Sequence, residues 1–230
     1  MTGTFITIEG IEGAGKSTIA KRLIEWLENQ GRECLHTREP GGTQAGEKIR
    51  EILLNPQIKL APETELLLFE AARRQIMEEQ ILPALQAGKT VVLDRFYDST
   101  TAYQGYGRGL DLDWIEKLNL FACHGRKPDL TILLDIDVRI GLQRARKVSG
   151  TDDRFESEKV DFMQRIHDEY QFLLFDLSKE SKSAGFMEQV RQGFLQIAEK
   201  DKERILVVKI NEDADKIWSN LQKKLKVRLK

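Results

Sequence analysis

The sequence predicts an α/β fold in which a parallel five-stranded sheet carries helices on both faces. Five short runs of β-branched and aliphatic residues alternate with longer segments of helical periodicity. Such alternation is typical of parallel sheets, and strands that are mostly apolar indicate cover on both faces. No low-complexity linker interrupts the 230 residues, so we expect one domain over residues 1–230.

The expected elements follow in a regular order along the chain. Candidate strands occupy residues 5–9, 33–37, 90–93, 130–135 and 205–210. Helical periodicity is found at residues 17–29, 47–54, 62–87, 111–123, 138–147 and 157–200. The first helix has one apolar stripe, formed by Ile19, Leu23, Trp26 and Leu27. Gly31 follows this stripe as a typical stop signal.

The composition argues against several classes of protein. The chain has 36 Lys and Arg against 37 Asp and Glu, whereas a protein that coats nucleic acid needs a basic surplus. Cys34 and Cys123 form no CxxC pair, which argues against a disulfide framework or a zinc site. The N-terminus lacks a signal-peptide pattern, and no run approaches the roughly 18 apolar residues of a membrane span. We therefore expect a cytoplasmic protein that contacts neither membrane nor nucleic acid.

A phosphate-binding loop follows the first strand and opens the first helix. Gly10-x4-Gly15-Lys16-Ser17 matches the P-loop pattern in the context that its mechanism requires. Its backbone N–H groups and the helix N-terminus would surround phosphates, Lys16 would reach the β- and γ-phosphates, and the Ser17 hydroxyl would bind Mg²⁺. The fold class is therefore a P-loop NTPase-type sheet. We expect the nucleotide to contact Gly10, Ile11, Glu12, Gly13, Ala14, Gly15, Lys16, Ser17 and Thr18.

Charged residues end two further strands. Asp94 and Arg95 follow a buried strand, and ligands of such folds bind at the carboxyl edge of the sheet. Arg95 offers a planar fork for phosphate oxygens, or alternatively forms a salt bridge with a neighbouring acid. Asp94 would hold Mg²⁺ through water, or cap the following turn. Because Arg38 adds a third cation at this edge, two phosphorylated substrates are indicated.

Several stretches together resemble the thymidylate kinases (dTMP kinases). They are "IEGIEGAGKST", "TREPGGT", "LLLFEAARRQ", "LDRFYDSTTAYQGYGRG" and "PDLTILLDIDVRIGLQRARK", in the family's order and usual spacing. "FMEQVRQGFLQIAEKDKERI" is similar to the family's late helix. The resemblance implies that ATP phosphorylates dTMP to dTDP with Mg²⁺, a step of dTTP biosynthesis. It also implies a mobile lid and a homodimer formed through helix faces.

The resemblance implies roles for individual residues of the acceptor site. Phe69 would stack on thymine, Arg73 would bond the carbonyl edge of the base, and Tyr103 would pack under the sugar and exclude a 2′-hydroxyl. From the pattern alone, Phe69 reads as a core residue, Arg73 as part of a solvated helix face and Tyr103 as an ordinary helix aromatic. Arg95 would hold the dTMP phosphate. The remaining acceptor residues would be Arg38, the Glu39-Pro40 pair (often a cis peptide in the family), Thr100, Thr101 and Gln104.

An acid inside the phosphate loop would be disfavoured by Coulomb repulsion from the phosphates of a nucleotide. In the family this acid faces the acceptor, so the resemblance implies that Glu12 bonds the 3′-hydroxyl of deoxyribose or helps to place Mg²⁺. The alternative is an inconsequential surface carboxylate.

A lid over residues 148–157 is expected to complete the catalytic machinery. Negative charge spreads over the transferred phosphoryl group, and residues 11–14 contain no basic side chain that would neutralise it. In "RARKVSGTDDRFE" Arg154 is the first candidate and Arg146 the second; the alternative is a solvated charge run. A further lid arginine of many relatives is replaced near Val148, which leaves the division of labour between the two open.

The chain departs from the family in length. Roughly 24 residues between the lid and Gly185 have no counterpart, so we expect an extra helical segment at about 160–185. "FMQRIHDEYQFL" from Phe162 and "FMEQVRQGFLQI" from Phe186 align at an offset of 24 residues. A partial duplication, an inserted excursion and coincidence between two amphipathic helices all remain open.

The sequence argues against several other functions. Another nucleoside monophosphate or deoxynucleoside kinase is the nearest rival, and Phe69, Arg73 and Tyr103 discriminate against it. A GTPase-like switch would need an NKxD-type motif, which the sequence lacks. Balanced charge opposes a nucleic-acid motor, and filled catalytic positions oppose a scaffold without activity. Acceptance of dUMP stays open.

Overall fold

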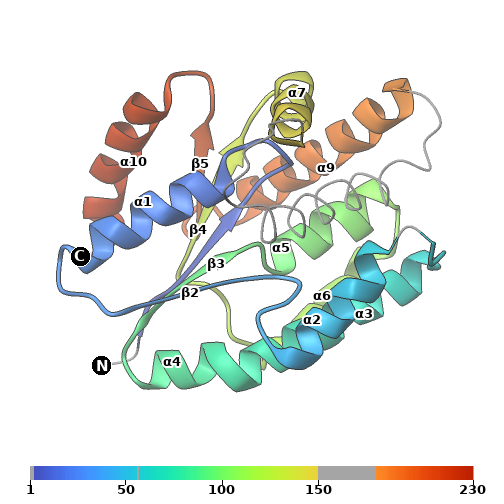
Figure 1. Ribbon diagram of the computed structural model, residues 1–230, viewed down its shortest axis with the longest axis horizontal. Coiled ribbons are helices and arrows are strands. Elements are labelled where there is room, and N and C mark those ends of the chain that lie inside the picture. The colour runs from blue at the N-terminus through green and yellow to red at the C-terminus, as the bar shows by residue number, and fades with distance from the viewer. Residues whose placement is uncertain (1–2, 56, 150–179, 230) are drawn as a thin grey trace.

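All five expected strands are present, and they form one parallel sheet (Figure 1). The computed structural model describes residues 3–55, 57–149 and 180–229. Within these residues the spatial order of the strands is β2-β3-β1-β4-β5. Their bounds are β1 Phe5–Glu9, β2 Cys34–Arg38, β3 Thr90–Asp94, β4 Leu130–Asp135 and β5 Ile205–Lys209.

Helices cover both faces of the sheet, as the apolar strands predict. The described helical segments are α1 Lys16–Glu28, α2 Gln44–Leu54, α3 Pro62–Ile76, η1 Met77–Ile81, α4 Leu82–Gln86, α5 Tyr97–Thr100, η2 Thr101–Gly107, α6 Leu112–Ala122, α7 Val138–Ser149, α9 Glu180–Lys200 and α10 Ala214–Arg228. Figure 1 shows α1 and α10 on one side of the sheet and α4 on the other. None of the helices described is both long and apolar enough to cross a membrane.

Alternate residues of β1 and β3 enter different halves of the core. Ile6, Ile8 and Val92 pack in one cluster with residues of α1, α9 and α10. Phe5 and Val91 pack in the other cluster, with residues of η1 and α4. Because successive side chains of a strand point to opposite faces, this division follows from the run of apolar residues in each strand.

One predicted helix is interrupted. The segment expected as a single helix over residues 62–87 is α3 and α4 joined by the π-helical turn η1. Pro83 has no N–H to bond four residues back, and its ring crowds the carbonyl of Glu79, which lies inside this turn. Widening to a π turn relieves that conflict without ending the helix.

Two helical regions are absent from the sequence-based prediction. Residues 97–107 form α5 and η2, although their Thr and Gly content is typical of a loop. Residues 214–228 form α10, which the prediction omitted. The excess-length segment and the first copy of the internal similarity, from Phe162, lie outside the described residues, whereas the second copy lies within α9.

The strand register brings three predicted site segments to one edge. Ile8 of β1 pairs with Asp94 of β3, which in turn pairs with Arg38 of β2. Each of these residues lies at or next to the carboxyl end of its strand. The phosphate loop, the Asp94-Arg95 pair and the segment from Arg38 therefore begin side by side.

Candidate functional site

The phosphate loop has a backbone that only glycine accommodates easily. Gly10, Gly13 and Gly15 have φ values of 139°, 71° and 89°, in the region that side-chain-bearing residues rarely adopt. A Cβ at Gly13 would lie 2.0 Å from the carbonyl oxygen of Gly141, and one at Gly10 would lie 2.5 Å from that of Leu134. The loop is thus pressed against β4 and α7 while its concave side stays turned toward a ligand.

Lys16 closes over this loop. Its Nζ donates hydrogen bonds of 3.1 Å to the carbonyl oxygens of Gly10 and Ile11. Burial and the nearby Arg95 lower the pKa of Lys16 to about 8. Because an incoming phosphate would favour the charged ammonium, Lys16 is suited to bind the phosphates of a nucleotide.

Glu12 points away from the phosphate side of the loop, toward Arg95 and Tyr103. Arg95 Nη2 lies 2.8 Å from Glu12 Oε1, and the Tyr103 hydroxyl donates to Glu12 at 2.8 Å. The Arg95 guanidinium also stacks over the Tyr103 ring, 5.1 Å from its centroid. The salt bridge weighed from the sequence for Arg95 is therefore present, with Glu12 as partner. Since Glu12 is 8% exposed, it is not a surface carboxylate.

Arg95 itself has an unusual backbone. Its φ of 66° lies in the left-handed region, which costs energy for a residue with a side chain. Its Nη1 donates to the carbonyl oxygen of Gly10 and to Ser99 Oγ, both at 3.2 Å. This conformation turns the guanidinium back over the phosphate loop.

Sequence analysis missed Glu9, the last residue of β1. Glu9 is fully buried and accepts hydrogen bonds from the Phe96 N–H at 2.8 Å and from Ser99 Oγ at 2.6 Å. Burial, then the charge of Asp98, raise the pKa of Glu9 to about 8. Glu9 thus fixes the residues on which Arg95 depends. An acid ending an otherwise apolar strand was the available signal.

Asp94 and Ser17 lie together beside the loop. Ser17 Oγ is 3.4 Å from Asp94 Oδ2, and Asp94 Oδ1 is buried without a hydrogen-bond partner among the described residues. No group of three or more His, Cys, Asp or Glu side chains in the described part of the chain could itself hold a metal ion. A hard cation here would depend on Asp94, Ser17, water and a ligand's phosphates, which is typical of Mg²⁺.

A second pocket adjoins the phosphate loop. Arg95 and Tyr103 line it, and both contact Glu12 of the loop. Phe69 is on its wall and not in the buried core, so the core reading of Phe69 is wrong. The peptide between Glu39 and Pro40 is cis, as in the family. The full lining is Glu39, Pro40, Phe69, Arg73, Arg95, Phe96, Ser99, Thr100, Tyr103 and Gln104.

Arg73 is the most strongly fixed cation of this pocket. It is 1% exposed, so the reading as a solvated helix face is wrong. Its guanidinium donates to Glu39 Oε2 and Thr100 Oγ1 at 2.9 Å, to Glu70 Oε1 at 2.5 Å and to Asn119 Oδ1 at 3.0 Å. Burial opposes its charge, but Glu39 and Glu70 more than offset this and raise its pKa. Burial in turn raises the pKa of Glu39 to about 7.

The structure places two predicted acceptor residues outside this lining. The Thr101 hydroxyl donates to the Tyr97 carbonyl oxygen at 3.1 Å and accepts from Asn119 at 3.2 Å. Arg38 Nη2 lies 3.2 Å from Glu47, while its buried Nε has no hydrogen-bond partner among the described residues. Gln104, on the lining, donates to Glu65 at 2.7 Å. Glu70 and Asn119, which accept hydrogen bonds from Arg73, were not predicted.

The predicted lid is not covered in full by the structure. Arg146 belongs to α7, but its side chain is not among those described. Arg154 and the rest of the lid from residue 150 lie outside the described residues.

Together these residues form two adjoining candidate sites for phosphorylated ligands. Lys16 and the glycine-rich loop define the first, and Arg95 belongs to both. The second has an aromatic wall and buried hydrogen-bonding groups, which suit a nucleobase and its sugar. Such an arrangement would bring two phosphorylated ligands together at the carboxyl edge of the sheet.

Comparisons with known proteins agree with this geometry. The family described as Thymidylate kinase matches residues 8–180. A Thymidylate kinase from Kosmotoga olearia is 43% identical over 98% of this chain and 97% of its own length, and one from Desulfosudis oleivorans is 44% identical over 89% and 87%. The crystal structure of thymidylate kinase from Ehrlichia chaffeensis matches with a TM-score of 0.71 and 32% identity, over 98% of this chain and 99% of its own. The chain belongs to the thymidylate kinase family.

Proposed function

We propose that this protein phosphorylates dTMP to dTDP with ATP as the phosphoryl donor. A phosphate oxygen of dTMP attacks the γ-phosphorus of ATP, the bond from that phosphorus to the β,γ-bridging oxygen breaks, and ADP leaves with the electron pair. The observation that carries this proposal is the pocket of Phe69 and Arg73, joined to the phosphate loop through Arg95. Membership of the family supplies the acceptor and the donor.

Each anchored side chain has a part in this reaction. Lys16 binds the donor phosphates, and Arg95 binds the phosphate of dTMP while its backbone N–H donates to the Ile8 carbonyl oxygen and its guanidinium donates to Ser99 Oγ. Charge-assisted contacts of this kind are stronger in a site closed to water than at a surface. Phe69 stacks on thymine and Arg73 bonds its carbonyl edge, directly or through water.

Mg²⁺ is the metal expected with ATP. Ser17 and Asp94, whose Oδ1 has no hydrogen-bond partner among the described residues, would hold it, and Glu12 is the third residue proposed to help place it. When bound, the ion would neutralise charge on the donor phosphates. Arg154 and then Arg146 remain the arginines proposed to neutralise the transferred group from the lid.

A homodimer is the proposed assembly. Helix α3 packs against both α2 and α6, and these three helices expose several large apolar side chains. They are Ile52 of α2, Leu67 of α3, and Trp114, Leu120 and Phe121 of α6. Large exposed apolar side chains on neighbouring helices are typical of a protein–protein interface.

An acceptor screen tests the proposed reaction. ADP release from ATP is measured with dTMP, dUMP, dCMP, dGMP and AMP, and Lys16→Ala serves as the inactive control. We expect dTMP to be used best and Lys16→Ala to release no ADP with any acceptor. Preference for dCMP, dGMP or AMP would replace dTMP kinase by another nucleoside monophosphate kinase. ADP release that is independent of every acceptor would exclude both.

A further inference from the structure

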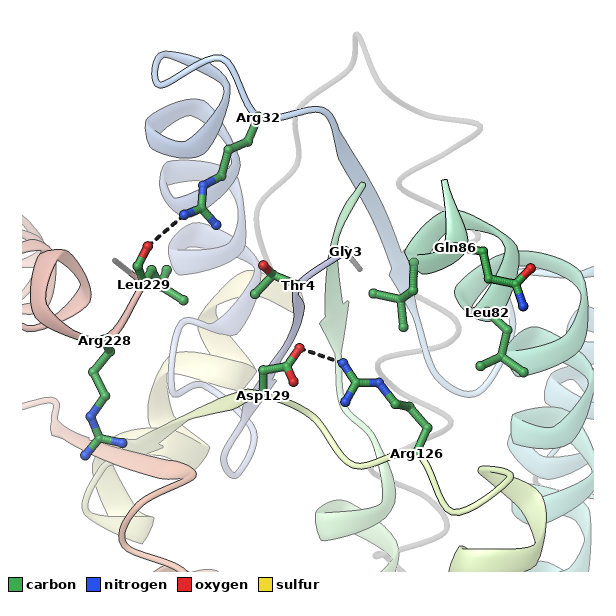
Figure 2. A pocket seen from close by; sticks show the side chains of 10 residues that line it. Gly3, Thr4, Arg32, Leu82, Gln86, Arg126, Asp129, Arg228 and Leu229 are labelled. Carbon is green, nitrogen blue, oxygen red and sulfur yellow. Dashed lines mark hydrogen bonds and ion pairs between the residues drawn. The ribbon is translucent and has the colours of Figure 1, made fainter. Parts of the chain in front are cut away.

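A second polar cavity lies at the opposite edge of the sheet from the phosphate loop. Figure 2 shows it next to Gly3 and Thr4, which precede β1, with Asp129, which precedes β4, and Arg32, which precedes β2. Its volume is about 600 Å³, within the range of small-molecule sites. No step of the proposed reaction uses this end of the strands.

Three arginines from distant parts of the chain meet around this cavity. Arg32 lies between α1 and β2, Arg126 between α6 and β4, and Arg228 in the last turn of α10. In Figure 2, Arg32 is on one side of Thr4 and Arg126 on the other. Asp129 is the one acid among the described lining residues, so the walls carry a positive surplus.

The contacts of these arginines hold them in place and leave donors available. Arg32 Nη2 donates to the Leu229 carbonyl oxygen at 2.7 Å, and Arg126 Nη2 donates to Asp129 at 2.7 Å. Arg228 donates to the carbonyl oxygens of Lys202 and Glu203. A guanidinium has five N–H donors, and within the described residues these bonds occupy one each in Arg32 and Arg126.

Apolar and polar surfaces complete the walls. Leu82 and Leu85 of α4 and Leu229 provide apolar area, while Thr4 and Gln86 provide hydrogen-bonding groups. A bare inorganic ion would leave the leucines uncovered. A molecule that carries phosphate at one end and a ring at the other matches both parts of the lining.

We propose that this cavity binds a small organic phosphate of the nucleotide class, at a site separate from the catalytic one. Arg32, Arg126 and Arg228 receive its phosphates, and the leucines cover its ring. The bound molecule would connect α4, α10 and the starts of β1, β2 and β4. Such a ligand stabilises the folded chain by an amount that rises with the logarithm of its concentration once this exceeds the Kd.

The site is tested by changing its charge without cutting any of these bonds. Gln86 is exposed on the lining, and none of its side-chain atoms takes part in a hydrogen bond within the described residues. Gln57, exposed and outside the cavity, is the matched position for the same substitutions. Binding of dTTP is measured by titration calorimetry with dTMP and ADP saturating the catalytic site, so that catalytic-site occupancy is the same in every variant.

The sign of the substituted charge decides the outcome. We expect Gln86→Glu to weaken dTTP binding and Gln86→Lys to strengthen it, each by about 3- to 10-fold, as one charge acts on a phosphate group across the cavity. Gln57→Glu and Gln57→Lys should leave the affinity for dTTP unchanged. All four variants should release ADP with dTMP at the wild-type rate. Tripolyphosphate should bind at least about 10-fold more weakly than dTTP, because it lacks the ring.

Three results overturn the proposal. One is the absence of any dTTP binding once dTMP and ADP are saturating. Another is an equal response to substitutions at Gln86 and Gln57. The third is tripolyphosphate binding as tightly as dTTP, which would make the cavity a site for bare anions.

Discussion

Glu12 illustrates how one residue serves both ligand sites. Its carboxylate is held by Arg95 and Tyr103, and it therefore stands between the phosphate loop and the acceptor pocket. A 3′-hydroxyl that donates to this carboxylate makes a charge-assisted bond, and a ligand without the hydroxyl leaves an acceptor unpaired in a closed site. Discrimination for that hydroxyl is thus expected at Glu12.

The substitution Glu12→Gln tests this role. Wild-type protein should prefer dTMP to its 3′-deoxy analogue by about 10-fold or more, corresponding to a loss of about 1.5–3 kcal/mol. The preference should narrow in Glu12→Gln, since an amide still bonds the hydroxyl but tolerates its absence better. Titration calorimetry of both ligands against both proteins gives the four affinities. An equal preference in the two proteins would restrict Glu12 to the metal or to the loop.

Glu9 makes stability depend on pH. In the folded chain its pKa is raised from 4.5 to about 8, by burial and then by Asp98. The stabilisation from the neutral Glu9 carboxyl is fully present below its pKa in the unfolded chain. It is lost as the pH rises toward 8, because Glu9 ionises first in the unfolded chain. The pKa of Lys16 is lowered from 10.5 to about 8, so the titration of Lys16 changes the stability only above about pH 8.

Glu9→Gln should therefore gain stability relative to wild type as the pH rises. Urea denaturation at pH 5 and pH 8 measures the free energy of unfolding of each protein. We expect wild type to lose more stability than Glu9→Gln between the two values, while Glu25→Gln, at an exposed position on α1, should follow wild type. A difference between wild type and Glu9→Gln that stays constant across this range would mean that Glu9 is already ionised at pH 5.

At the scale of elements, the contact between η2 and α9 depends on small residues. A Cβ at Gly193 of α9 would lie 2.7 Å from three side-chain atoms of Tyr106, including Cβ and Cγ next to the backbone. Gly185 of the same helix has no atom of the described residues within 4 Å of the corresponding position. The two glycines thus share a helix and differ in their surroundings.

Alanine at these two positions should have opposite effects. Gly185→Ala should stabilise the protein by about 0.5–1 kcal/mol through helix propensity. Gly193→Ala should destabilise it by about 1–3 kcal/mol, since Tyr106 must move out of a packed contact. Chemical denaturation of both variants provides the comparison. If Gly193→Ala proved as stable as Gly185→Ala, η2 and α9 would not be in close contact.

The elements that the sequence could not predict are those set by tertiary contacts. The strands follow from their own apolar residues, and their predicted bounds differ from the observed ones by at most one residue at either end. The η2 segment has Thr and Gly in place of helix formers, and its packing on α9 stabilises it instead. By contrast, α10 was predictable, because Asp213 caps it and Ile217, Leu221 and Leu225 form a stripe.

At the scale of the whole molecule, some residues of the candidate site could be predicted from the sequence and others could not. Lys16, Ser17 and Arg95 are recognisable because local motifs at strand ends carry them. Glu9 and Asn119 are distant in sequence from the residues they fix, Ser99 and Arg73, and only the assembled fold brings them together. Local patterns predict the groups that touch ligands, and the fold selects the groups that hold those in place.

The exposed apolar side chains of α2, α3 and α6 predict that two copies of the chain associate through these helices. Phe121 belongs to this surface and is 75% exposed. The Cζ atom of Arg74 lies 5.8 Å from the centroid of the Phe121 ring. Burying such side chains between two copies would remove them from water, and the charge of a carboxylate placed there would be desolvated by the apolar side chains of the partner copy. Wild-type protein should sediment at about twice the chain mass of 26.4 kDa, and Phe121→Glu at the mass of one chain. Val227, 72% exposed on α10 and away from this surface, provides the control, and Val227→Glu should remain a dimer. A monomeric wild type would remove the homodimer from the proposal, whereas dissociation of Val227→Glu but not of Phe121→Glu would move the interface to α10.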